Sequence, residues 1–297
     1  VYSPDWRSDE RVVYSRVLGD VLAGVLPEGV SGSISTVPGS YKPWITCDHD
    51  VVRMAENLAE VALHYHSIRE QTGREVVLAL EPEPDCFLGT MADVEAFFAG
   101  ALLEQGVSVI RERLGVSLTA AEQVLRDHVG FCLDTAHMAA EFEDLADVLA
   151  RTKALGVRLA KVHLSAALSV LPGEDAAAAL APFVEEVYLH QVRMRGRDGE
   201  ILAFPDLDVS IEHASDAVGT EWRVHFHVPL FFEEAGPLRS TTFLFTPEVL
   251  SELRSGGCPH LEIETYTFGV LPPVLQVADV TDGIAREYKW VLGRLFS

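Results

Sequence analysis

Short runs of β-branched and apolar residues alternate along the chain with longer runs rich in Ala, Leu and Glu. The short runs predict strands over residues 30–37, 75–83, 129–136, 157–165, 222–230 and 261–267. The longer runs have helical spacing and predict helices over residues 50–70, 94–114, 120–128, 143–155, 247–254 and 282–295. The opening run VYSPDWRSDERVV is polar and turn-like and predicts no element. This alternation predicts an α/β fold with a parallel sheet.

Each predicted strand after the first has one apolar face and carries a polar residue on the other face near its C-terminal end. These end residues are Glu81, Asp134, His163, His227 and Glu264. In a barrel of parallel strands the apolar faces meet the helices, and the C-terminal rim carries the active site. A half-exposed antiparallel sheet alternates in the same way, but its solvent face mixes Thr, Lys and Ser. The pattern therefore favours a barrel, formed as a single domain over residues 1–297.

Four of the strand-end side chains form a set suited to a divalent metal: Glu81, Asp134, His163 and Glu264. Three carboxylates and one imidazole suit Mn, Mg, Co, Fe or Zn, and the ligand types do not choose among them. Each of these residues taken alone could be a hydrogen-bonded core group. Their convergence at one barrel mouth would cost much free energy without a metal or substrate, so we expect a metal site.

A second group consists of His137, in the motif DTAH, and of His225 and His227, which share one strand face. These imidazoles predict either a second metal site or contacts to substrate oxygens. Glu83 and Glu262 lie one step from a predicted ligand and are expected to support the ligands or fill the barrel. Lys161 and Arg223 are expected to neutralise those carboxylates, or else to contact an anionic substrate.

Composition narrows the function classes. The 297 residues are 48% hydrophobic and carry a formal charge of −22, which argues against disorder and against nucleic-acid binding. No apolar stretch reaches the length of a membrane helix, and the N-terminus lacks the pattern of a signal peptide. The four cysteines are far apart and form no CxxC pair, which argues against a disulfide framework. We therefore expect a cytoplasmic protein that is not inserted in a membrane.

Residues 166–220 form a long connection after the fourth predicted strand. The stretch HQVRMRGRDGEILAF within it predicts a hairpin closed by the GRDG turn. Because the connection leaves the predicted catalytic rim after His163, it is either a lid over the site or a surface decoration or oligomer contact.

The order of Glu, DxxH, single His, HxH and final Glu resembles the xylose isomerase-like TIM-barrel superfamily, which includes sugar epimerases and endonuclease IV. The segments SISTVPGSYKPW, LALEPEPDC, DTAHMAAEFED, KVHLSAAL, WRVHFHVPLF and LEIETYTFGVLP resemble more closely its EboE-type metabolite traffic proteins. The resemblance spans about residues 31–292 and implies a (β/α)8 barrel whose first two βα units are missing from this chain. Endonuclease IV has a metal-binding His before its PGS turn, whereas this chain has Val37 at that position. This difference, together with the acidic charge, argues against a role in DNA repair.

The resemblance also implies roles for the residues. Glu81 and Glu264 would be the acid/base pair, Asp134 and His163 fixed metal ligands, and His137 a ligand of substrate or of a second metal. A second metal at His137, His225 and His227 would favour hydrolysis, because a metal pair can hold both an activated water and a leaving oxygen.

We therefore predict a metal-dependent isomerase or epimerase that acts on a small hydroxycarbonyl metabolite and holds one or two divalent ions per chain. Two alternatives stay open: a dimetal, phosphoesterase-like hydrolase, and a non-catalytic metabolite-binding protein of an Ebo-type traffic system. The expected partner is a small metabolite, and self-association is left open.

Overall fold

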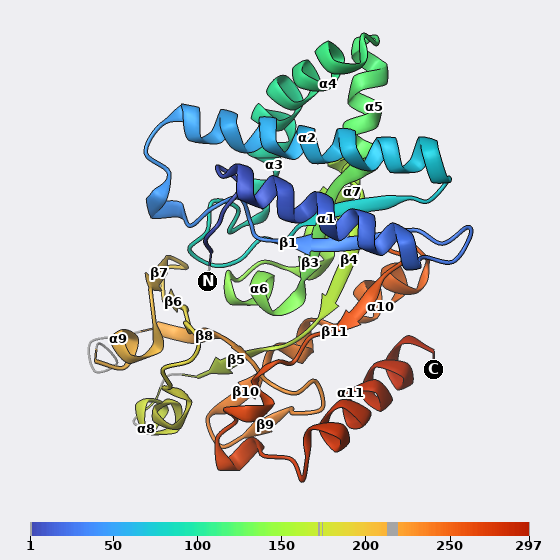
Figure 1. The fold of residues 1–297 in the computed structure, drawn as a ribbon. Coiled ribbons are helices and arrows are strands. Elements are labelled where there is room, and N and C mark those ends of the chain that lie inside the picture. The colour runs from blue at the N-terminus through green and yellow to red at the C-terminus, as the bar shows by residue number, and fades with distance from the viewer. Residues whose placement is uncertain (1, 172, 174, 213–218, 297) are drawn as a thin grey trace. The chain divides into compact units, whose positions relative to one another are not determined.

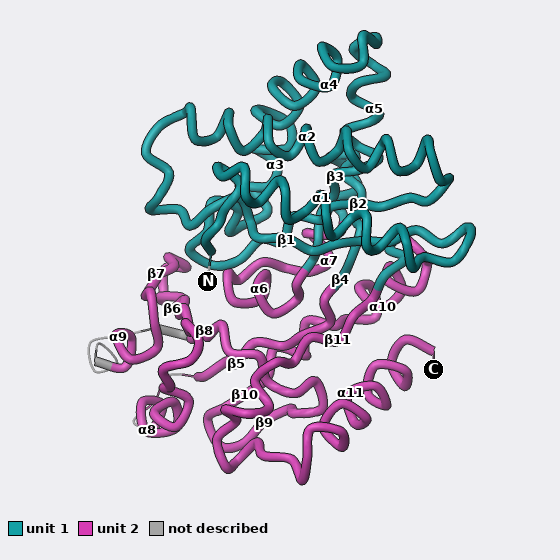
Figure 2. The backbone as a smooth tube through the Cα atoms, in the orientation of Figure 1, with its two compact units in different colours: residues 1–133, 150–162, 258–260 teal, residues 134–149, 163–257, 261–297 magenta. Residues whose placement is uncertain are grey.

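The computed structural model describes residues 2–171, 173, 175–212 and 219–296, and the chain divides into two compact units (Figure 2). Unit 1 comprises residues 1–133, 150–162 and 258–260, and unit 2 comprises residues 134–149, 163–257 and 261–297. Parallel strands connected by helices confirm the predicted α/β class. A closed barrel, a single domain and the two missing βα units stay predictions.

Unit 1 is built on a parallel sheet (Figure 1). Its strands follow the order β1 Gly32–Thr36, β2 Val76–Leu80, β3 Val129–Asp134 and β4 Leu159–Leu164. All residues of β2 and β3 are buried, as is typical of parallel strands that are covered on both faces. The last residue of β3 and the last two of β4 already belong to unit 2. The four predicted strands are confirmed, with ends up to three residues shorter.

Helices pack on this sheet, with α1 and α2 lying against each other and against β2. The helices are α1 Asp9–Val25, α2 Asp48–Thr72, α3 Met91–Ala99, α4 Val107–Leu114, α5 Leu118–His128 and, shared with unit 2, α7 Leu145–Leu155. Short turns are η1 Lys42–Trp44 and the π-helical η2 Leu102–Gly106. No helix in the described part of the chain is both long and apolar enough to cross a membrane.

Two helical predictions need correction. The polar N-terminal run starts a helix, because the Ser8 side chain accepts a hydrogen bond from the Glu10 N–H and caps α1. The helix predicted over residues 94–114 is interrupted, since α3 ends at Gly100, which has φ −101° and ψ −111°, and a π-helical turn precedes α4. A Cβ atom at Gly100 would lie 2.6 Å from the Ala96 carbonyl oxygen, so only glycine fits this break.

Gly130 allows β3 and β4 to approach closely, which gives a first testable prediction. A Cβ atom there would lie 2.6 Å from the Arg158 carbonyl oxygen, and backbone atoms of a central strand cannot easily give way. We expect Gly130→Ala to lower the free energy of unfolding by about 1–3 kcal/mol, measured by urea denaturation. Gly173→Ala, with open space around the Cβ position, is the matched control. Equal stability of the two variants would contradict the prediction.

Unit 2 contains an antiparallel sheet with the strand order β7-β6-β8-β5-β10-β9. Its strands are β5 Ala167–Val170, β6 Val192–Gly196, β7 Ile201–Phe204, β8 Gly219–His227, β9 Glu234–Ala235 and β10 Leu238–Ser240. The helices are α6 Thr135–Ala140, α8 Ala176–Leu180, α9 Leu207–Glu212, α10 Pro247–Arg254 and α11 Val280–Leu295. The short 3₁₀ turns are η3 Ala181–Phe183, η4 Thr241–Leu244, η5 Thr267–Gly269 and η6 Pro273–Leu275. The short strand β11 Leu261–Ile263 runs beside the end of β4, where the Glu264 N–H donates to the Leu164 carbonyl at 3.2 Å.

The prediction that residues 222–230 form a strand of the parallel sheet is wrong. This segment is β8, which pairs antiparallel with β5 on one side and with β6 on the other. The chain turns back after β4 to form β5, and the predicted GRDG hairpin supplies β6 and β7. Alternation of polar and apolar residues is the same in a central antiparallel strand, so the pattern alone could not distinguish the two sheets.

Candidate metal centre

Asp134 stands where β3 turns into α6 and serves as the N-cap of that helix. Its Oδ1 accepts hydrogen bonds from the backbone N–H groups of Ala136 at 2.7 Å and His137 at 2.9 Å, and from the Ser165 hydroxyl at 2.8 Å. Asp is a favoured N-cap, which explains why the DTAH sequence starts a helix here. The other oxygen, Oδ2, is buried and has no hydrogen-bond partner. One oxygen of Asp134 thus orders the backbone while the second remains available to a ligand.

His163 of β4 and Glu264, which follows β11, lie beside this free oxygen. His163 Nδ1 is 3.1 Å from Glu264 Oε2 and 3.8 Å from Asp134 Oδ2. One ligand atom from each of the three residues lies within 4.8 Å of the others. His163 and Asp134 are buried, whereas the Glu264 side chain is 33% exposed. Two carboxylates and an imidazole therefore converge in unit 2, with one carboxylate reaching solvent.

His137, His225 and His227 form a second cluster, which we call the histidine cluster. His137 comes from α6, and its ring centroid is 4.5 Å from that of His225 and 5.5 Å from that of His227. All three residues are buried, and one ligand nitrogen from each lies within 4.8 Å of the others. His225 and His227 therefore lie near each other and near His137, and their role as ligands of a metal or a substrate stays a prediction.

The hydrogen bonds of the histidine cluster leave ligand nitrogens facing one another. His225 Nδ1–H donates to Gln191 Oε1, and His227 Nδ1–H donates to the Glu264 carbonyl oxygen, both at 2.7 Å. The Nε2 atoms of both rings are buried without a partner. Burial, followed by the neighbouring His137 and His227, holds the pKa of His225 well below its ordinary value, which keeps this ring neutral. Neutral imidazoles whose other nitrogen is fixed by a carbonyl are the usual form of metal-binding histidine.

Together these observations fit a divalent metal. Both groups of residues contain buried atoms without a hydrogen-bond partner. These atoms are Oδ2 of Asp134, beside His163 and Glu264, and the Nε2 atoms of His225 and His227 in the histidine cluster. A buried polar atom without a partner costs free energy, which a bound cation would offset. Imidazole and carboxylate donors suit Zn, Mn, Fe or Co.

Two arginines hold the end of α6, which carries His137. Arg223 of β8 donates to the Ala139 carbonyl at 2.8 Å and pairs with Glu221 at 2.9 Å. Arg193 of β6 pairs with Glu141 through two hydrogen bonds, of 2.6 and 3.0 Å. Arg223 is therefore the charge partner of Glu221. The predicted neighbour Glu262 lies with its Oε2 3.8 Å from His163 Nε2 and is half exposed.

Three predicted residues belong to unit 1. Glu81 follows β2, where its N–H donates to the Thr36 carbonyl at 3.1 Å, and its side chain is partly buried. Glu83 accepts a hydrogen bond from the Tyr2 hydroxyl at 2.7 Å. Lys161 lies in β4 and is partly buried. Their participation in the metal centre stays a prediction from the sequence.

The sequence did not single out Gln191, which precedes β6 and orients His225. No local pattern marks it, because its partner lies 34 positions along the chain. Residues 166–220 contain the predicted hairpin, in which Gly199 adopts a left-handed φ of 83° and the Gly196 N–H donates to the Glu200 carbonyl. Residues 172, 174 and 213–218 of the proposed lid lie outside the described ranges.

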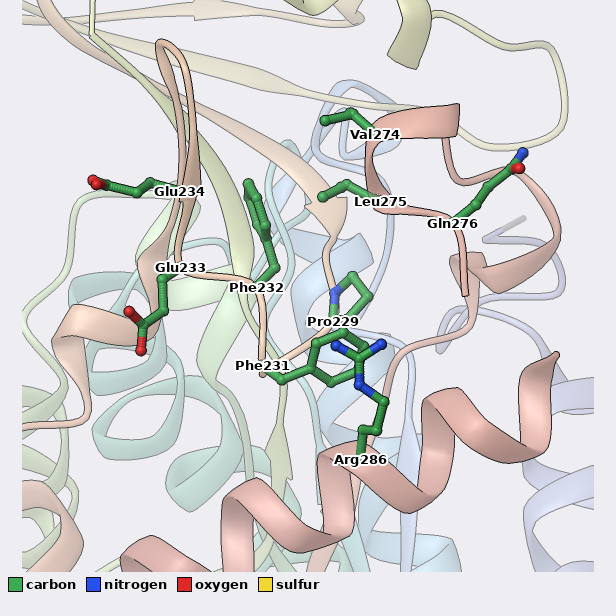
Figure 3. Close-up of a pocket in the computed structure, with 9 residues that line it drawn as sticks. All are labelled: Pro229, Phe231, Phe232, Glu233, Glu234, Val274, Leu275, Gln276 and Arg286. Atoms are coloured by element: carbon green, nitrogen blue, oxygen red, sulfur yellow. The ribbon is translucent and has the colours of Figure 1, made fainter. Parts of the chain in front are cut away.

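A separate cavity of about 400 Å³ lies in unit 2 (Figure 3). It is lined by Pro229 and residues 231–234 after β8, by Val274, Leu275 and Gln276, and by Arg286 of α11. None of these residues belongs to the group of Asp134, His163 and Glu264 or to the histidine cluster. The cavity is therefore distinct in its residues from the candidate metal centre.

A scan against protein-family models and a search of curated proteins find no match to this chain. Among solved structures, the chain is similar to the IOLI protein, whose crystal structure is described as having a binding zinc atom. The sequences are 12% identical and the TM-score is 0.42, over 97% of this chain and 72% of the IOLI chain. Since this likeness is too weak to assign a family or a reaction, the function is inferred below from the residues themselves.

Proposed function

We propose that this protein is a divalent-metal-dependent enzyme that moves a proton on a small hydroxycarbonyl metabolite, as an isomerase or epimerase does. The observation that carries this proposal is the buried, unpartnered Oδ2 of Asp134 beside His163 and Glu264. Burying these groups is unfavourable without a compensating cation. A site that held only structural hydrogen bonds would be expected to satisfy that oxygen.

The three residues have different exposures, which suit different roles. Asp134 and His163 are both buried, and hydrogen bonds hold the Asp134 carboxylate in place, so the two residues would serve as fixed ligands. Glu264 is partly exposed and can accept a proton from a carbon next to a carbonyl and return it. A divalent metal bound here would act as a Lewis acid that polarises the substrate carbonyl and makes the neighbouring carbon more acidic. The resemblance to sugar epimerases implies that Glu81 would be the second proton carrier.

The histidine cluster favours a second candidate function, that of a dimetal hydrolase. It offers three further imidazole side chains as ligands, and the His227 bond to the Glu264 carbonyl links it directly to the first set. Two neighbouring metals would hold an attacking water and a leaving oxygen, as in phosphoesterases. The number of metal ions bound per chain therefore decides between proton transfer and hydrolysis.

Metal analysis and isotope exchange together test the proposal. The protein, purified without chelator or affinity nickel, is expected to contain a stoichiometric divalent metal. Incubated with ketoses in deuterated water, it should exchange hydrogen for deuterium at the carbon next to the carbonyl. Glu264→Gln should slow this exchange by about a hundredfold or more, because the amide cannot carry the proton. Glu248→Gln, an exposed carboxylate on α10, is the control and should exchange normally.

Three other results would overturn the proposal. Phosphodiester cleavage without deuterium exchange would establish the hydrolase instead. A protein that neither contains metal nor binds added Mn²⁺ or Zn²⁺ would leave the non-catalytic, metabolite-binding alternative. Equal exchange rates in wild type and Glu264→Gln would show that Glu264 carries no proton.

A further inference from the structure

A carboxylate is buried in the row of α11 side chains that faces the interior of unit 2. The buried residues of α11 are Gly283, Glu287, Val291 and Leu295, and Glu287 is only 1% exposed. Burial raises the pKa of the Glu287 carboxyl above its ordinary value. Since an apolar residue would fill this position at less cost in free energy, the carboxylate needs an explanation.

One oxygen of Glu287 bonds to the two segments that follow the site residues His227 and Glu264. Its Oε1 accepts hydrogen bonds from the Leu230 N–H at 3.0 Å and from the Thr265 hydroxyl at 2.6 Å. Leu230 lies three residues after His227, and Thr265 directly follows Glu264. Glu287 therefore ties the segment after β8 to the segment after β11.

Other contacts show that these two segments are joined next to the site. The Thr267 hydroxyl donates to the His227 carbonyl oxygen, in addition to the bond from His227 to the Glu264 carbonyl. Arg286 stacks its guanidinium 3.7 Å from the ring centroid of Phe231 (Figure 3). Two consecutive residues of α11 thus hold the segment that follows His227.

We propose that Glu287 is a positioning residue of the metal centre, which fixes His227 and Glu264 relative to each other by bonding to the segment that follows each of them. The inference rests on the proposed function, because it assumes that Glu264 serves the proposed metal site, to which His227 is joined by its bond to the Glu264 carbonyl. Groups that orient metal ligands without touching the ion change metal affinity by about 10- to 100-fold. This task accounts for a buried carboxylate whose second oxygen has no hydrogen-bond partner.

The test is a titration of the metal-free protein with Co²⁺, whose visible absorption bands report the geometry of its ligands. Glu287→Leu removes both hydrogen bonds and is expected to weaken Co²⁺ binding by about tenfold or more and to alter the bands. Glu287→Gln keeps an acceptor oxygen and is expected to restore the wild-type bands and to bind within about threefold of wild type. Lys289→Gln changes an exposed charged side chain of the same helix and should leave both measurements unchanged.

The outcomes separate this inference from the proposed function. If wild type takes up no Co²⁺, the proposed function fails and the positioning role fails with it. If wild type binds Co²⁺ and Glu287→Leu has the same affinity and bands, only the positioning role is overturned. Should Glu287→Leu not fold, Thr265→Val decides, because it removes the 2.6 Å bond and leaves the carboxylate in place. Weaker binding in Thr265→Val supports the role, and wild-type binding overturns it.

Discussion

Asp134→Asn is expected to keep the fold of the protein and to lose its bound metal. Asn is as good an N-cap as Asp, so its side-chain oxygen should still accept from the Ala136 and His137 N–H groups and hold the start of α6. The second position, now an uncharged NH₂ group, can no longer serve as a ligand. Because Asp134 Oδ2 is buried and has no hydrogen-bond partner, its replacement should affect metal binding far more than folding.

We expect the affinity for Zn²⁺ or Mn²⁺ to fall by roughly a hundredfold or more, since loss of a direct ligand should exceed the effect of losing an orienting group. Metal content of the purified protein and competition with a chromogenic chelator measure this change. The unfolding midpoint of the metal-free variant should stay within about 3 °C of wild type. Asp134→Ala, which also removes the cap, should lose about 1 kcal/mol of stability in addition. A variant Asp134→Asn that keeps stoichiometric, tightly bound metal would exclude Asp134 as a ligand.

Acid is expected to destabilise the protein through His128 of unit 1. His128 is fully buried at the end of α5, where Nδ1–H donates to the Val76 carbonyl at 2.9 Å and Nε2 has no partner. Burial lowers the pKa of His128 to about 4. In the unfolded chain the same ring titrates near 6.5. Between these two values the unfolded state binds the additional proton, so lowering the pH favours unfolding.

The contribution of the neutral His128 ring to the free energy of unfolding is therefore complete above pH 6.5. It is lost progressively as the pH falls towards 4. The difference between the two pKa values of His128 corresponds to roughly 3 kcal/mol in the free energy of unfolding. About 2 kcal/mol of this should be lost between pH 7.5 and 5. Urea denaturation at these two pH values measures the change. His128→Gln should show a smaller loss of stability on acidification than wild type, whereas His49→Gln, exposed on α2, should behave as wild type. Parallel pH profiles for wild type and His128→Gln would contradict the prediction.

Much of the candidate site could be predicted from the sequence because a strand has a strict two-residue period. Asp134 and His163 end their strands on the same edge as predicted, and Glu264 follows the third. The spacing of His225 and His227 likewise fixes a shared face, whichever sheet the strand joins. The spacing of side chains depends only on the strand itself. The wrong assignment of β8 to the parallel sheet therefore did not affect the prediction that His225 and His227 share a face.

The features that were missed depend on contacts between distant parts of the chain. Gln191 and Glu287 act through hydrogen bonds to residues 34 and 57 positions away, and neither has a local pattern that marks it. The pairing of β8 with β5 and β6 was likewise missed, because the alternation of polar and apolar residues within β8 does not indicate which strands it pairs with. The helix α1 was missed for another reason, since the polar residues of its first turn are equally common in turns.

The two compact units are interleaved in the chain, since each draws on three separate segments. Residues 1–133 expressed alone would lack residues 159–162 of β4, and residues 134–297 would include β4 without its neighbouring strand β3, nearly all of which belongs to unit 1. Cutting the polypeptide chain at one position therefore cannot separate the two units. We therefore expect that neither unit can be transferred to another protein as one continuous segment, because each is completed by residues from elsewhere in the chain.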